Sequence, residues 1–425
     1  MKRYLAIVVA FAMIFSMTAC GRASKLFEGN TSQDGQTNQA VEDESQLKAG
    51  FLFPSGNDAP DTVSHVEGIR KMQSETGLTD SQIVIKTNIT KEQYESEIDA
   101  LVEKGCDIIF AKSADSEEAM VAAAQKYPEV QFCQEDGKKA QKSGLSNYHN
   151  FYVKLYEAYY MAGIAAGMKM NEMLNDGKVS SYNCVIGFAA TRENAENISC
   201  INGFSLGVKS VCTQASVLVR YVGSKEDYDA DGECARQLIA AGAHMMCQRT
   251  FTAAIATVCA ENDVPVVGNE VNMINTAPNE AITSTTADWS VYYTYAVNAL
   301  LEQKEIDTDW CGGYKEGAVL LTQFNDKILA DGTIDRVAEA EAQLRKGELS
   351  VFKTENFTID GESLESLVEN NGNYKKYKTY LKDGVFRESY KRSAPVMKFL
   401  IDGVSVSTGN YLEEEPQEAT TEENQ

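Results

Sequence analysis

Short apolar runs alternate with amphipathic segments along the chain from about residue 47 onward. Runs such as CDIIFAK, at residues 106–112, are nearly continuous in apolar residues, which is typical of strands in a parallel sheet covered on both faces. Between such runs, apolar residues recur at helical spacing, as do Tyr94, Ile98 and Leu101. The alternation predicts an α/β fold in which largely parallel sheets are flanked by helices. We expect strands at residues 48–53, 82–87, 106–112, 130–135, 183–190, 216–223, 243–249 and 264–269, and helices at 63–77, 91–105, 116–128, 155–174, 198–211, 232–242 and 252–262.

The same rhythm of strands and helices occurs twice along the chain. The stretch LVEKGCDIIF at residues 101–110 corresponds to LIAAGAHMMC at residues 238–247. The repetition predicts two similar lobes, a first that begins with residues 47–157 and a second that spans residues 158–285. Two such lobes that face each other create a cleft at the carboxyl ends of their strands, where open α/β sheets place ligands.

The chain starts with a segment typical of exported bacterial proteins. Basic residues precede an apolar stretch that is too short for a comfortable membrane span, so residues 1–19 are predicted to be a cleaved leader. The four residues MTAC, at positions 17–20, resemble the bacterial lipobox. In that motif the cysteine, here Cys20, is acylated and becomes the mature N-terminus. The alternative is a plain secretory signal with an incidental cysteine. We expect a protein held by lipid on the extracytoplasmic face of the cell membrane.

Two polar segments and the overall composition narrow the function classes. Residues 20–46 are predicted to be a flexible tether and residues 411–425 an acidic disordered tail. The formal net charge of −23 argues against nucleic-acid binding, which requires basic residues to neutralise phosphates. The ten cysteines include no CxxC pair and no histidine at metal-ligand spacing, so neither a metal site nor a cofactor is expected.

A series of motifs occurs in a fixed order from about Lys48 to Phe324, with a weaker echo in RKGELSVFKTENFTIDGE. The motifs are AQKYPEVQF, LYEAYYMAGIAAGMKM, INGFSLGVKS, VRYVGSKEDY, LIAAGAH, VPVVGNE, AITSTTADWSVYY and WCGGYKEGAVLL. In this order they resemble the basic membrane lipoprotein (Bmp/Med) family.

The resemblance implies a two-lobed fold like that of type I periplasmic binding proteins. It implies a substrate-binding lipoprotein that delivers a small molecule, a purine nucleoside in characterised relatives, to the permease of an ABC importer. It also implies that the chain crosses between lobes several times, so that residues from about 286 to 410 complete the first lobe.

The resemblance also suggests ligand-binding residues. Asp58 stands at the acidic position that begins the family's first helix, and His65 stands where the Med-like branch has its histidine. The aromatic residue expected to stack on a base falls at Asp61, and the acidic residue after VPVVG falls near Asn272. The lysine usual in the nucleoside-binding branch falls near Ala287 or Asp288, and rings could come instead from Trp289, Tyr292 and Tyr293.

Polar residues at the ends of the predicted strands supply the other candidates for ligand contacts, because parallel strands display such residues in the cleft. Arg249 offers a planar fork of donors for a carbonyl, a carboxylate or a base edge. For each of them the alternative is a loop-capping or solvated side chain. The candidates are Ser55, Asn57, Lys112, Ser113, Gln248, Arg249, Thr250, Asn269 and Glu270.

Two other functions compete with solute delivery. A surface receptor that senses a ligand without transporting it would use the same cleft, so the sequence does not separate the two. A hydrolase is suggested by GFSLG at residues 203–207, which matches the G-x-S-x-G nucleophile motif. That motif requires a strand before the serine, whereas Ile198, Ile201 and Phe204 place Ser205 within a helix. No enzymatic activity is therefore expected.

Overall fold

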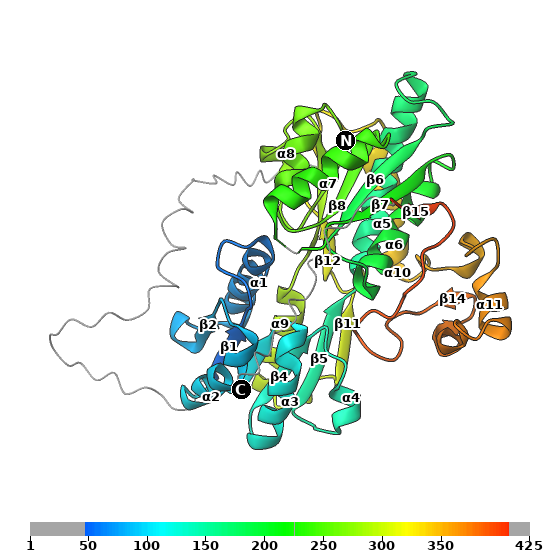
Figure 1. Ribbon diagram of the computed structural model, residues 1–425. Coiled ribbons are helices and arrows are strands. Elements are labelled where there is room, and N and C mark those ends of the chain that lie inside the picture. Colours follow the sequence, from blue (N-terminus) through cyan, green and yellow to red (C-terminus); the bar gives the residue numbers. More distant parts are fainter. Residues whose placement is uncertain (1–46, 225, 408–425) are drawn as a thin grey trace, which may run out of the picture. The chain divides into compact units, whose positions relative to one another are not determined.

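The computed structural model describes residues 47–224 and 226–407 of the chain (Figure 1). The predicted leader, the acylated Cys20, the tether and the acidic tail at 411–425 lie outside these described residues. Within the described ranges, no helix is both long enough and apolar enough to cross a membrane.

The first sheet has six strands in the order β11-β5-β4-β3-β1-β2, and every neighbouring pair is parallel. Helices α2 and α3 pack on one face through Ile98, Leu101 and Met120, while α1 and α9 pack on the other. Pro60 begins α1, where its fixed φ favours a first helical turn, and Gly77 ends the helix in a left-handed conformation. The elements are β1 (Ala49–Leu52), α1 (Pro60–Thr76), β2 (Ile83–Lys86), α2 (Tyr94–Glu103), β3 (Ile108–Ala111), α3 (Glu117–Lys126), β4 (Gln131–Glu135), α4 (Ala140–Ser143), β5 (Tyr148–Val153), α9 (Ser290–Leu301) and β11 (Asp309–Gly312).

The second sheet has seven strands in the order β12-β10-β9-β8-β6-β7-β15. Only the β10–β12 pair is antiparallel. Helices α7 and α8 cover one face, and the long α5 and α6 cover the other (Figure 1). The elements are α5 (Leu155–Asn175), β6 (Val185–Ala190), α6 (Ala195–Lys209), β7 (Ser216–Tyr221), α7 (Tyr228–Ala240), β8 (Met245–Arg249), α8 (Ala254–Glu261), β9 (Val266–Asn269), β10 (Ala281–Ala287), β12 (Val319–Leu321) and β15 (Val404–Val406).

The predicted α/β class with two largely parallel sheets is confirmed. The apolar pattern does not predict β5, because its sequence YHNFYV places two polar residues inside a buried strand. The structure accommodates both of them with hydrogen-bond partners. His149 Nε2 lies 2.9 Å from the Gln131 side chain, and Asn150 donates to the Asp309 carboxylate at 3.2 Å.

The C-terminal part of the chain contacts both sheets. The predicted return to the first lobe occurs at β11, which pairs with β5, but β15 pairs with β7 of the second sheet. Hydrogen bonds between Asn202 of α6 and the backbone of Phe399 and Ile401 direct the chain to that edge. The sequence prediction assigned residues from about 286 to 410 to the first lobe, whereas β12 and β15, both within that range, belong to the second sheet. The intervening elements are α10 (Thr333–Lys346), α11 (Leu364–Asn370), β13 (Leu381–Lys382) and β14 (Val385–Phe386).

Glycines allow α5 and α6 to approach closely. A Cβ atom added to Gly207 of α6 would lie 2.0 Å from the Tyr160 carbonyl oxygen, and one added to Gly163 of α5 would lie 2.2 Å from the Phe204 carbonyl oxygen. Both neighbours are backbone atoms, so neither contact can be relieved by a change of side-chain rotamer. The GIAAG stretch therefore serves helix packing.

We predict that Gly207→Ala lowers the free energy of unfolding by about 1–3 kcal/mol, because the added methyl group forces the two helices apart. Gly232→Ala in α7 is the matched control, since its nearest neighbours would lie at 3.5 Å or beyond. The control should be neutral or stabilise by up to about 1 kcal/mol, as alanine is the better helix former. Urea denaturation of both variants measures the difference, and equal effects would contradict the close packing.

Candidate ligand-binding cleft

A cavity of about 450 Å³ is lined from both lobes by residues that follow the strands. Its first-lobe wall comes from the ends of β1, β3, β4 and β5, and its second-lobe wall from the ends of β6, β8 and β9. We call this cavity the cleft. Its lining includes Ser55, Asp61, Lys112, Ser113, Asp115, Glu135, Asp136, Tyr152, Thr191, Arg192, Asn194, Glu196, Asn197, Arg249, Phe251, Glu270 and Trp289.

A buried charge network forms the first-lobe wall. Lys112 Nζ lies 3.2 Å from the Asp61 carboxylate and 3.0 Å from His65 Nε2. Burial and the Lys112 charge lower the pKa of His65 to about 4, so its ring is neutral near pH 7. An ammonium group can only donate, so Nε2 accepts from Lys112, and Nδ1 donates to the Tyr293 hydroxyl oxygen at 2.7 Å.

An indole ring continues this wall. The Trp289 ring stacks on the His65 ring with 4.3 Å between centroids and an interplanar angle of 19°. Trp289 immediately precedes α9, which packs beside α1, and only 3% of its surface is exposed. One face of the indole is therefore covered by His65, while the side chain also borders the cleft.

A second charge network forms the opposite wall. Arg249, at the end of β8, pairs with Glu196 at the start of α6 and lies 3.4 Å from Glu270 after β9. Its guanidinium lies over the Phe251 ring, 5.2 Å from the ring centroid. Burial raises the pKa of Glu270, and the Arg249 charge opposes that shift. This wall thus presents acidic groups, a fixed cation and an aromatic ring.

Three residues of the cleft have left-handed backbones although none is glycine. Ser113 has φ 138°, Asp136 has φ 52° and Glu270 has φ 62°. Each follows the carboxyl end of a parallel strand by one or two residues, and such conformations are costly outside glycine. These three backbone conformations cost folding stability, and they set the directions of the side chains at the cleft. Such clustering is typical of a functional site.

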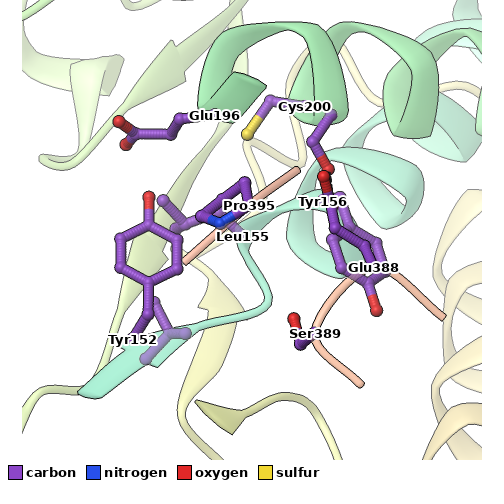
Figure 2. A pocket seen from close by; sticks show the side chains of 10 residues that line it. Tyr152, Leu155, Tyr156, Glu196, Cys200, Glu388, Ser389 and Pro395 are labelled. Carbon is purple, nitrogen blue, oxygen red and sulfur yellow. Dashed lines mark hydrogen bonds between the residues drawn. The ribbon is translucent and has the colours of Figure 1, made fainter. Parts of the chain in front are cut away.

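Several buried polar atoms that border the cleft have no hydrogen-bond partner among the residues that the structure describes. They are the Tyr152 hydroxyl, Arg249 Nε and Glu270 Oε2. Figure 2 shows the Tyr152 hydroxyl directed toward the Glu196 side of the site. Buried polar groups in folded proteins almost always have a partner, ordered water included, so these atoms are available to water or to a bound ligand.

The structure brings six of the candidate residues to the cleft: Ser55, Lys112, Ser113, Arg249, Glu270 and Trp289. His65 and Tyr293 lie behind this wall and are buried. Gln248 and Asn269 are buried beneath Arg249, where their amides donate to the carbonyls of Thr252 and Thr250 at 3.1 Å.

Three other candidates lie outside the lining of the cleft. Asn57 and Asp58 are exposed, because α1 begins only at Pro60. Asp61, in the first turn of α1, provides the buried carboxylate instead. Asn272 caps a short 3₁₀ helix by accepting from Ile274 N at 2.9 Å, and Glu270 is the acidic residue after β9 that borders the cleft.

Sequence reasoning missed several residues of the cleft. Glu135 and Asp136 end β4, so the strand-end rule that selected Lys112 would have found them. Tyr152 lies on β5, which the apolar pattern did not predict. Glu196 and Phe251 have no local signal, because only the tertiary fold places them beside Arg249.

A family model matches most of the chain and supports the assignment of the fold. The Bmp model, described as an ABC transporter substrate-binding protein that is PnrA-like, matches residues 47–354. The chain belongs to this family. The resemblance predicted from the motifs is therefore confirmed, and the Bmp chain is an extracytoplasmic substrate-binding protein of an ABC transporter.

Two curated proteins are similar to this Bmp chain in sequence. A purine-binding protein of Brucella abortus is 26% identical over 315 residues, which are 74% of this chain and 85% of that protein. A protein of Haloferax volcanii, whose name assigns it to glucose binding for an ABC transporter, is 27% identical over 264 residues. That match covers 62% of this chain and 63% of the relative.

Solved structures share the fold. A solute-binding protein from Conexibacter woesei has a TM-score of 0.59 at 17% identity and covers 72% of this chain and 98% of its own. A solute-binding protein from Aeropyrum pernix has the same TM-score at 16% identity and covers 80% of this chain and 98% of its own. The predicted two-lobed fold of periplasmic binding proteins is confirmed.

The structure does not place the GFSLG motif at a turn between a strand and a helix, as the hydrolase alternative requires. Ser205 lies in the interior of α6, with 1% of its surface exposed, and the preceding strand β6 ends well before it, at Ala190. The family and the fold are those of solute-binding proteins, which are not enzymes.

We predict that the His65 ring stays neutral from about pH 8 down to about pH 5.5, because its pKa is lowered to about 4. Histidine ring resonances followed by NMR test this, with His65→Gln to identify the signal. His149 is an internal comparison, since burial also lowers its pKa to about 4. A His65 midpoint near its ordinary value of about 6.5 would show that the network around Lys112 does not form.

Proposed function

We propose that this Bmp protein binds a purine nucleoside in the cleft and delivers it to the permease of an ABC importer. The observation that carries the proposal is the combination of aromatic rings and buried acceptors in one cavity: Trp289 and Phe251 from opposite lobes, with the carboxylates of Asp61, Glu135 and Glu270. Aromatic side chains stack on a base, and carboxylates accept hydrogen bonds from ribose hydroxyls and ring amino groups.

Binding would favour the closed arrangement of the lobes because the ligand contacts both walls. A ligand shifts such an equilibrium only through its differential affinity for the closed form. The unsatisfied Tyr152 hydroxyl belongs to the first lobe, whereas the free oxygen of Glu270 belongs to the second. A single ligand that forms hydrogen bonds with both groups would therefore have a higher affinity for the closed form than for the open form.

The names of the two relatives favour ligands of two different chemical classes. The Brucella abortus relative is named for purine binding and the Haloferax volcanii relative for glucose binding. Both ligand types are donor-rich, and glucose is therefore the second candidate. We favour the nucleoside because two aromatic rings border the cleft, in addition to its carboxylates.

Thermal shift with the mature protein tests the ligand class. We predict that adenosine, guanosine or inosine raises the melting temperature, because a ligand at one hundred times its Kd adds about 2.7 kcal/mol of stability. In a Trp310→Phe background, Trp289 is the remaining tryptophan, so a change in its emission would report binding in the cleft. If no nucleoside or base raises the melting temperature and glucose does, the proposal of a nucleoside ligand is wrong.

Paired variants control for the location of this binding. Trp289→Leu should weaken nucleoside affinity by about tenfold or more, since it removes a ring from the cleft. Asp58→Asn should leave affinity unchanged, because Asp58 is exposed outside the lining. Calorimetry measures both affinities. If Asp58→Asn weakens binding and Trp289→Leu does not, the ligand binds at the loop before α1.

We propose that the protein is anchored by lipid on Cys20 and works with a membrane permease. The lipobox-like order MTAC and the leader before it support the anchor. We predict that mass spectrometry of the mature protein finds Cys20 as an acylated N-terminal residue, and that Cys20→Ser protein is no longer retained on membranes. Retention of the variant would favour a different anchor.

Ligand binding without uptake in cells that carry the permease would favour a sensing receptor.

A further inference from the structure

The C-terminal segment at residues 388–398 lies beyond the part matched by the family model and is fixed to both lobes. Glu388 is buried, accepts from Ser199 of α6, and accepts from Met397 N at 2.8 Å. The backbone N–H of Ser393 donates to Asp309 of β11 in the first sheet. The segment is therefore held from both sides.

This segment borders the site directly. Figure 2 shows Glu388, Ser389 and Pro395 beside Tyr152 and Tyr156. The small cavity among these residues has a volume of only about 10 Å³, about enough for one water molecule. The segment is thus packed against the end of β5 and the start of α5.

A larger cavity opens on the other side of the same segment. It has a volume of about 610 Å³, and we call it the side chamber. Arg392, Pro395 and Lys398 form its C-terminal wall. Asp136, Asn194 and Glu196 line both the side chamber and the cleft, so the two spaces adjoin at these residues.

The charges of the two spaces differ. Six acidic and three basic residues line the cleft, and its two buried cations are already paired, Lys112 with Asp61 and Arg249 with Glu196. Three acidic and three basic residues line the side chamber. Among the described residues, no carboxylate lies within 4.0 Å of the side-chain nitrogens of Arg392 or Lys398. In the described chain an acidic group would therefore find two such cations in the side chamber, whereas in the cleft only Arg192, which is exposed, lacks a carboxylate within that distance.

Arg392 is held in a defined orientation. Its Nε donates to the Ala394 carbonyl at 3.3 Å, and its Nη2 donates to the Pro395 carbonyl at 3.2 Å. Its Nη1 makes no hydrogen bond within the described ranges, and the residue is half-buried. A fixed guanidinium loses little entropy when it binds an oxyanion, and its planar donors match carboxylate and phosphate oxygens.

We infer that the side chamber binds an acidic substituent, a carboxylate or a phosphate, on a ligand whose body lies in the cleft, with Arg392 as the specificity-determining residue. This inference rests on the proposed nucleoside-binding function. Lys398, at the same wall, adds a second positive charge.

The acidic residues at which the two spaces adjoin do not prevent such binding. Asp136 has Lys138 Nζ at 3.9 Å, and Glu196 is engaged by Arg249. Burial and the neighbouring Glu196 charge raise the pKa of Asp136 to about 7, so part of the protein carries a neutral Asp136 near that pH. Glu193 is the third acidic residue of the side chamber, and its basic residues are Lys138, Arg392 and Lys398.

Calorimetry on the mature protein tests the inference with three ligands that differ only at the 5′ position: adenosine, its 5′-monophosphate and its 5′-carboxylate. We expect one or both acidic ligands to bind at least about tenfold more tightly than adenosine, as charge-assisted hydrogen bonds to a guanidinium are strong. The phosphate and carboxylate arms identify which acid is preferred. Adenosine binding with no gain for either acid would overturn the side-chamber inference alone, whereas no binding of any of the three would count against the proposed function itself.

Variants separate a binding role of Arg392 from a structural one. Arg392→Met and Lys398→Met should each reduce the preference for the acidic ligand over adenosine, and Arg392→Lys should retain part of it. Lys391→Met is the matched control, because Lys391 is an exposed residue of the same segment that does not line the chamber. If Arg392→Met lowers the melting temperature of the free protein and leaves the ligand preference intact, Arg392 only balances the acidic wall and the inference is wrong.

Discussion

Pairing of buried charges is the constraint on which the cleft depends. Arg249 is buried and Lys112 is largely buried at strand ends, with 4% and 17% of their side chains exposed, and an isolated charge there would be strongly unfavourable. Asp61 in the first lobe and Glu196 in the second supply the compensating carboxylates. Each wall is thereby held in shape before any ligand arrives, and each retains polar atoms that its own network does not satisfy. Such preorganisation reduces the entropy lost on binding.

The parallel strands explain why these residues meet. All strands of the first sheet run in one direction, so residues distant in sequence, such as Lys112 and Tyr152, emerge at the same edge. The left-handed backbones of Ser113 and Asp136 then turn the chain sharply at that edge, and Glu270 does the same after β9 of the second sheet. Aromatic packing beneath, such as Phe151 on Tyr292 with ring centroids 4.1 Å apart, supports this arrangement from the core.

The repeating apolar runs were sufficient to predict the fold class, because strands buried on both faces and amphipathic helices leave distinct patterns. They did not reveal β5, whose polar residues are buried with partners, nor the edge position of β15. Strand ends predicted Lys112 and Arg249 in the cleft. Asp58 was selected because it matches a position of the family motif. The buried acidic residue is Asp61 instead, because α1 begins at Pro60 and places Asp61 in its first turn. Contacts such as Glu196 with Arg249 depend on tertiary structure and have no signature in the local sequence.

The position of β15 has a consequence for self-association. By pairing with Val217–Val219, the short strand Val404–Val406 occupies the backbone N–H and C=O groups along the outer side of β7. β7 alternates buried and half-buried side chains, and a bare strand of this kind is a template for pairing with another molecule. The last described strand of the chain therefore shields its own sheet from intermolecular strand addition, so a chain cleaved upstream of it would be prone to aggregate.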